Sequence, residues 1–161
     1  MTTDRTTYDE RLLLCRAGAV LCGLPLTQVR ETMRPLPIRP LGGLPPFVSG
    51  VSIIRGAPVP VVDAGALLGS RDRGRPTRFV TLRLGDRSVA LAVDEVLGVR
   101  DGRSLSLQGL PPLLTRMKPR VAALIGAVDA EFLAVLRDAR FVPDRAWPAP
   151  GSDGEVVWPT N

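Results

Sequence analysis

An internal repeat is the feature of this sequence that most restricts the folds open to it. When the sequence is compared with itself at a shift of 67 residues, the segment 11–29 lies on 78–96, and Gly18 coincides with Gly85. Apolar residues fall on apolar residues along most of both segments. Because self-similarity at a fixed period indicates a repeated supersecondary unit, we expect two related units.

A second match joins the later parts of the two units. The segment 47–63 is similar to 122–138 at a shift of about 75 residues, and Gly50 coincides with Gly126. A unit of roughly 65 residues is marginally stable when it folds alone, because so little of its surface becomes buried. The two units are therefore expected to pack together and share apolar contacts.

Short strands joined by tight turns are expected within each unit. The chain has 16 Gly and 16 Pro, and the apolar runs 11–16 and 19–24 have the length of strands on either side of Ala17-Gly18. Residues 28–34 alternate between apolar and polar side chains, which is typical of a half-exposed strand. We predict an all-β fold of two packed units, each with five short strands that can close into a small barrel.

A hairpin followed by a short helix is predicted at the end of the first unit. The runs 47–54 and 57–62 flank Arg55-Gly56, and two prolines in the second run indicate an edge strand or a bulge. Asp63 is expected to cap one or two helical turns that end at Gly69. The predicted boundaries are a single domain over 10–142, barrels over about 11–69 and 76–141, a flexible N-terminus over 1–9 and a disordered Pro-rich tail over 143–161.

The composition excludes most enzyme mechanisms. The chain has no His, so acid–base catalysis by His, His-activated nucleophiles and His-ligated metal sites are unavailable to it. Cys15 and Cys22 are too few for a metal site and are expected to be small buried residues of a reducing compartment. Asp94 and Glu95 are adjacent in a predicted strand, where neighbouring side chains point to opposite faces. We expect no enzymatic activity, no metal and no cofactor.

Signals for export or membrane insertion are also missing from the sequence. The first eleven residues are polar, and no uninterrupted run of apolar residues and Gly is longer than the eight residues 121–128. That run is far shorter than the ~20 residues that cross a bilayer as a helix. We therefore expect a cytoplasmic protein.

Positive charge is concentrated in the first half of the chain, and this suggests a different class of function. Residues 1–80 contain 11 Arg against 6 acidic residues, and the whole chain has a formal charge of +5. Such an asymmetry is found in nucleic-acid-binding proteins. The densest cluster, 71–78, has the composition of an exposed connector, and aromatic residues that could stack on bases are few. A basic β-barrel that binds nucleic acid is the alternative from a different class.

Three separate stretches resemble the CheW-like family of chemotaxis coupling proteins. They are PPFVSGVSIIRGAPVPVVDAGALLG (45–69), VALAVDEVLGV (89–99) and SLQGLPPLL (106–114), and they occur in the order found in the family. The likeness covers about residues 10–142. It implies two SH3-like β-barrels and a non-enzymatic adaptor, which couples the cytoplasmic tip of methyl-accepting chemoreceptors to the regulatory domain of the chemotaxis histidine kinase. Contact with the membrane is implied only through the receptors, and no nucleic acid is expected.

The resemblance also implies two contact surfaces. The receptor-facing groove of the family is matched by Val29, Glu31 and Arg55 from the first barrel and by Val93 and Val96 from the second. The kinase-facing apolar edge of the first barrel is matched by Ile53, Val59 and Val61. The Arg-rich connector and a tail containing Trp147 and Trp158 lie outside the family pattern. Because of these two segments, an adaptor of a non-flagellar chemosensory pathway remains an alternative function.

Overall fold

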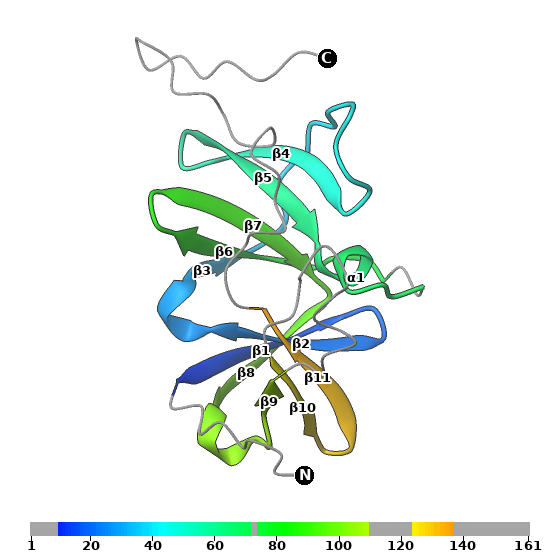
Figure 1. The fold of residues 1–161 in the computed structure, drawn as a ribbon. Helices are drawn as coiled ribbons and strands as arrows, with labels where there is room; N and C mark the ends of the chain where they lie inside the picture. The colour runs from blue at the N-terminus through cyan, green and yellow to red at the C-terminus, as the bar shows by residue number, and fades with distance from the viewer. Residues whose placement is uncertain (1–9, 72–73, 110–123, 137–161) are drawn as a thin grey trace.

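The computed structural model describes residues 10–71, 74–109 and 124–136, which form two β-sheets with very little helix (Figure 1). The first sheet contains, in spatial order, β8 (Glu95–Asp101), β1 (Arg11–Ala17), β2 (Val20–Pro25), β11 (Glu131–Val135), β10 (Leu124–Val128) and β9 (Gln108–Gly109). The second contains β3 (Val29–Met33), β6 (Arg78–Leu84), β7 (Arg87–Val93), β5 (Ala57–Asp63) and β4 (Val48–Ile54). The predicted all-β architecture of two packed units is confirmed, and Figure 1 shows the two sheets one above the other.

The repeated hairpins appear at the two predicted places. β1 and β2 are joined by a turn in which Gly18 has a φ of 60°, and β6 and β7 are joined by a turn in which Gly85 has a φ of 66°. Only glycine adopts this left-handed conformation at no steric cost, so the same residue is required at the same point of both turns. The coincidence of these two glycines in the repeat therefore reflects a shared turn.

The two sheets do not follow the two halves of the sequence, and this corrects the predicted barrel boundaries of 11–69 and 76–141. β3 leaves the first hairpin and pairs with β6, and β8 leaves the second hairpin and pairs with β1. The crossings occur at the short 3-10 helix Leu26–Gln28 and at Asp94. Each sheet thus combines the first hairpin of one predicted unit with the later strands of the other, β1–β2 with β8–β11 and β6–β7 with β3–β5, which ties the two units together through backbone hydrogen bonds as well as packing.

β5 is an interior strand, although its two prolines suggested an edge. Its last three residues, Val61 to Asp63, pair in parallel with β7, and its residues from Ala57 to Val62 pair with β4. Pro58 and Pro60 come before the segment that pairs with β7, so their missing N–H groups remove no bond from that ladder. A bulge is present in the same hairpin, between Val48 and Gly50 of β4.

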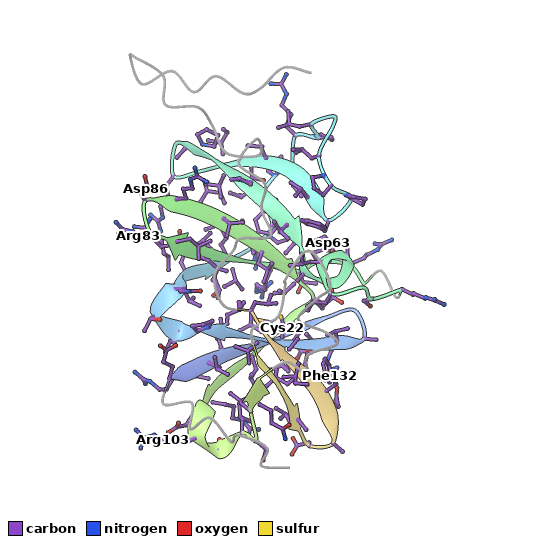
Figure 2. All side chains as sticks on the ribbon, in the orientation of Figure 1. Cys22, Asp63, Arg83, Asp86, Arg103 and Phe132 are labelled. Atoms are coloured by element: carbon purple, nitrogen blue, oxygen red, sulfur yellow. The ribbon has the colours of Figure 1, made fainter. Side chains whose placement is uncertain are left out.

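The largest apolar core contains buried residues from the hairpins of both sheets, including Cys15, Leu24, Leu91 and Val93. Cys15 and Cys22 lie directly opposite each other on β1 and β2, and both are fully buried. Hydrogen bonding with Cys15 and burial raise the pKa of the Cys22 thiol. The prediction that both cysteines are buried is confirmed, and Figure 2 shows Cys22 near the junction of the two sheets.

The short helix α1 (Ala64–Leu67) follows β5 as predicted. The Asp63 side chain accepts a hydrogen bond from the Ala66 N–H at 3.2 Å, and Gly69 has a φ of 75° where the helix ends. No helix in the described part of the chain is long and apolar enough to span a membrane. The expected flexible N-terminus (1–9), the Pro-rich tail (143–161) and both tryptophans lie outside the described residues.

Candidate functional site

Glu31 and Arg55, two residues that the sequence singled out separately, bind each other. The Arg55 guanidinium donates from Nε to Glu31 Oε1 at 2.8 Å and from Nη2 to Glu31 Oε2 at 2.6 Å. This two-point geometry fixes the direction of the guanidinium plane. The Arg55 side chain is nevertheless 78% exposed, whereas that of Glu31 is 28% exposed. The pair therefore presents a cation of fixed orientation to the solvent.

The position of this ion pair depends on the curvature of the five-stranded sheet. Glu31 belongs to β3, which is one edge of the sheet, and Arg55 lies in the turn that follows β4, which is the other edge. A flat sheet would keep these two edges far apart. The ion pair therefore joins the two ends of the sheet, in agreement with the barrel-like unit predicted from the sequence.

The backbone of Arg55 is in a conformation that arginine disfavours. Arg55 and Gly56 have φ angles of 51° and 77°, and they connect the paired residues Ile54 and Ala57 in a two-residue turn. Asn, Asp or Gly is usually found at the first position of such a turn, because a Cβ crowds the backbone there and only the short polar side chains of Asn and Asp offset this by local hydrogen bonds. The Arg55 guanidinium is therefore placed at this point at the cost of local conformational strain.

The electrostatics of the pair follow from its hydrogen bonds. The Arg55 guanidinium lowers the pKa of the Glu31 carboxyl below its usual value, and the positive charge of Arg30 contributes to the lowering. Reciprocally, Glu31 raises the pKa of Arg55. Both side chains are therefore charged throughout the physiological pH range.

The other residues expected in the receptor-facing groove are less accessible. Val29 and Val96 are half-buried and pack against the largest core. Val93 is fully buried within that core. A side chain with no exposed surface cannot contact a partner, so Val93 is corrected from a contact residue to a core residue.

The expected kinase-facing set divides in a similar way. Ile53 lies on the edge strand β4, and 62% of its surface is exposed. Val59 and Val61 are buried in a second core together with Phe79 and Ile54. Both side chains pack within that core, and for that reason these two valines are corrected from surface residues to core residues. Ile53 alone keeps the exposure that a contact residue needs.

A second ion pair was not anticipated from the sequence. Arg16 on β1 donates to Glu131 at the start of β11 at 2.9 Å. This hydrogen bond raises the pKa of Arg16, and the negative charge of Glu95, which lies beside Arg16 on β8, adds to the increase. The hydrogen bonds from Arg16 lower the pKa of Glu131. The partners are 115 residues apart, so no local pattern could have indicated the pair.

Asp94 also has a role that its sequence position did not show. It lies where the chain crosses from β7 to β8, its carboxylate accepts from the Gly18 N–H at 2.8 Å, and its own N–H donates to the Arg16 carbonyl at 2.8 Å. Asp94 therefore connects the crossing point to the β1–β2 hairpin. Within the described ranges, no group of three or more His, Cys, Asp or Glu residues is arranged to hold a metal ion.

Comparison with known proteins gives this architecture a family. The CheW-like domain family matches residues 11–142. The chain belongs to the CheW-like family. A chemotaxis protein CheW from Rhizobium meliloti (strain 1021) is 26% identical over 133 residues, which are 81% of this chain and 86% of that protein. The crystal structure of the scaffolding protein TtCheW from Thermoanaerobacter tengcongensis matches with a TM-score of 0.66 and 22% identity, over 81% of this chain and 90% of that one.

The CheW-like domain includes both described sheets. It begins at the first residue of β1 and extends past the end of β11. The two-subdomain, SH3-like architecture that the sequence resemblance implied is confirmed by the match to the scaffolding protein. The Arg55–Glu31 pair and Ile53 all lie in the five-stranded subdomain.

Proposed function

We propose that this chain is a non-enzymatic cytoplasmic adaptor that couples methyl-accepting chemoreceptors to the chemotaxis histidine kinase. The proposal is supported by its membership of the CheW-like family and by relatives described as a chemotaxis protein and a scaffolding protein. An adaptor of this kind needs surfaces for at least two partners. The five-stranded subdomain offers two exposed features of different chemistry, an oriented ion pair and an apolar edge.

The Arg55–Glu31 pair carries the receptor-binding part of the proposal. Arg55 is strained in its turn and largely exposed, so the pair adds little to the stability of the fold. Strained residues that the surrounding structure holds in place are concentrated at functional sites. A guanidinium held by one carboxylate keeps further N–H donors for a second acceptor, such as a polar side chain or carbonyl of a receptor tip.

The Ile53 edge carries the kinase-binding part. β4 is the last strand of its sheet, and a partner barrel can pair with such an edge through backbone hydrogen bonds. The short segment around Arg39 covers part of this edge, with Arg39 and Val51 bonded in both directions at 2.7 and 2.9 Å. Ile53 lies beyond that bridge, where the edge is exposed and apolar.

The substitution Arg55→Asn tests the receptor site without disturbing the turn. Asn tolerates the positive φ of this position, so the variant should melt at or above the temperature of the unmodified chain. Its affinity for a receptor-tip fragment should fall about tenfold or more, because a charge-assisted contact is lost. Binding to the regulatory domain of the kinase should be unchanged. Calorimetric titrations with each partner measure both affinities.

A matched control exists at the equivalent turn of the other sheet. Asp129 precedes Ala130 in the turn between β10 and β11, and its φ of 49° is close to that of Arg55. Asp129→Asn should alter neither binding reaction. Unchanged receptor affinity in Arg55→Asn, or an equal loss of both partners accompanied by a lower melting temperature, would contradict the proposed receptor site.

A further inference from the structure

Every second residue of β4 turns its backbone groups away from β5. Ile54 and Ala57 flank the two-residue turn of the β4–β5 hairpin, so they form a hydrogen-bonded pair. Such pairs alternate with non-hydrogen-bonded pairs along an antiparallel ladder. The N–H and C=O groups of Val51 and Ile53 consequently point to the outer edge of the five-stranded sheet.

The residues of β5 that lie opposite these two positions agree with this arrangement. Pro58 is paired with Ile53, and Pro60 is paired with Val51. A proline has no N–H, so both prolines lie where the β4–β5 ladder requires no donor. The outer edge of β4 therefore has two positions, Val51 and Ile53, at which a further strand can form hydrogen bonds.

The connection between β3 and β4 already occupies one of these positions, and Figure 1 shows it beside β4. The Arg39 N–H donates to the Val51 carbonyl at 2.7 Å, and the Val51 N–H donates to the Arg39 carbonyl at 2.9 Å. Residues 35–40, the strap, thus lie antiparallel to β4 at this point. The Ser52 hydroxyl holds the strap at a second point by donating to the Pro37 carbonyl at 2.8 Å.

The sequence of the strap prevents it from pairing fully with the other position. With Arg39 opposite Val51 in an antiparallel register, the residue opposite Ile53 is Pro37. Pro37 has no N–H for the Ile53 carbonyl, and within the described ranges Ile53 makes no backbone hydrogen bond to the strap. Every residue of the strap is exposed. Because so few bonds hold an exposed segment, the strap should open far more easily than the sheet beneath it.

We propose that the strap is a removable cover, and that an extended strand of the kinase regulatory domain displaces it and pairs with β4 at both Val51 and Ile53. The inference rests on the proposed function and adds the register and the regulation of the kinase-facing edge. A strand with an N–H opposite Ile53 forms two hydrogen bonds that the strap does not form, and it covers the exposed Ile53 side chain. A second copy of this chain fits less well, because its own β4 carries the same strap.

The first test locks the strap in place. The double variant Arg39→Cys/Val51→Cys puts two thiols in a hydrogen-bonded antiparallel pair, whose usual Cα separation of about 5.5 Å suits a disulfide. After oxidation, this variant should bind the kinase regulatory domain about tenfold or more weakly than it does after reduction. Its affinity for a receptor-tip fragment should be the same in both forms, because the Arg55–Glu31 pair is unchanged. Equal affinity of both forms for the kinase domain would overturn the inference.

The second test opens the strap. Arg39→Pro removes the N–H that the strap donates to Val51, whereas the matched control Arg39→Ala removes the same side chain and keeps the N–H. Calorimetry should show that Arg39→Pro binds the kinase domain about threefold or more tightly and that Arg39→Ala binds it like the unmodified chain. Equal affinities of the two variants would contradict the inference. Dimers of Arg39→Pro alone in sedimentation would assign the open edge to a second copy and overturn it as well.

Hydrogen exchange of the unmodified full chain, followed by NMR, tests the register directly. The Ile53 amide should exchange rapidly in the free chain and become protected when the kinase regulatory domain is bound. If the kinase domain binds and the Ile53 amide still exchanges rapidly, the inference is wrong and the adaptor proposal stands. If the unmodified chain does not bind the kinase domain, the proposed function and the inference fall together.

Discussion

The two sheets follow one strand plan but use their ion pairs differently. In each, a hairpin (β1–β2 or β6–β7) has two neighbours from the other unit, one antiparallel (β8 or β3) and one parallel (β11 or β5). In the five-stranded sheet, Arg55 and Glu31 join opposite edges. In the six-stranded sheet, Arg16 and Glu131 span only the intervening strand β2.

This difference separates what the repeat preserves from what it does not. The shared strands bury apolar side chains and are required by the fold in both halves. The feature that differs is the exposed guanidinium of Arg55, because the equivalent turn of the six-stranded sheet has Asp129 at this point, and an exposed side chain there adds little to folding. The functional surface is therefore expected where the two related units have diverged.

The largest contrast in stability between the units should appear at Gly50 and Gly126, the two glycines that coincide in the internal repeat. Gly50 has a φ of 143°, and a Cβ there would clash with the carbonyl oxygen of Arg39, so Gly50→Ala should lower the free energy of unfolding by about 3 kcal/mol or more. At Gly126 the nearest atom to an added Cβ is Leu107 Cδ2 at 2.7 Å, and that side chain can move, so Gly126→Ala should cost about 1–2 kcal/mol. Urea unfolding of both variants measures the difference, and equal costs would contradict this account of their surroundings.

A second contrast lies in the valines assigned to the groove. Val93→Ala should lower the free energy of unfolding by about 2–3 kcal/mol, because it leaves a cavity in the shared core. Val96→Ala, at a half-buried site, should cost about half as much. Thermal unfolding compares the two. A near-neutral Val93→Ala with impaired receptor binding would return Val93 to the contact surface.

Substitution of Asp94, where the chain crosses from β7 to β8, should have a smaller effect on stability, and this effect involves both sheets. Asp94→Ala leaves the Gly18 N–H without its carboxylate acceptor and should destabilise the chain by about 1–2 kcal/mol. Asp94→Asn keeps a side-chain oxygen that can accept the same bond, so it should recover most of the loss. Chemical denaturation of the two variants checks this, and equal destabilisation by both would show that the charge, rather than the hydrogen bond, is what matters.

The smallest effect concerns pH. The pKa values of Glu31 and Glu131 are lowered in the folded chain, so the stabilisation from both ion pairs is complete above the usual glutamate pKa of about 4.3 and is lost as the pH falls through the lowered folded values. NMR titration of the two carboxyl carbons should show both below 4.3. In Arg55→Asn only the Glu31 value should rise, and a simultaneous rise at Glu131 would mean that the two pairs are coupled.

Local sequence signals were sufficient to predict much of the fold. The hairpin turn at Gly18, the Asp63 cap and the half-exposed alternation of β3 depend on neighbouring residues, and all were predicted. The pairing of β3 with β6 and of β8 with β1 was not, because the apolar pattern of a half-exposed strand fits the edge of either hairpin. The choice between those edges is made by packing across the whole domain.

The burial of Val59, Val61 and Val93 was missed for a different reason, although a signal was present. The runs VPVV in β5 and VALAV in β7 contain no charged residue and no regular polar position. Such runs are typical of strands covered on both faces. At the candidate site, the resemblance supplied Glu31 and Arg55 as separate contact residues. Their mutual bond depends on the curvature of the sheet, which no short-range pattern specifies.

The most direct test of the adaptor proposal is whether one chain binds both partners at the same time. The chain is first saturated with a receptor-tip fragment and is then titrated calorimetrically with the regulatory domain of the cognate histidine kinase. Saturable binding with an affinity close to that of the receptor-free chain is the predicted result, because the Arg55–Glu31 pair and the Ile53 edge are separate features. Absence of kinase binding, or displacement of the receptor fragment by the kinase domain, would contradict a role in coupling the two.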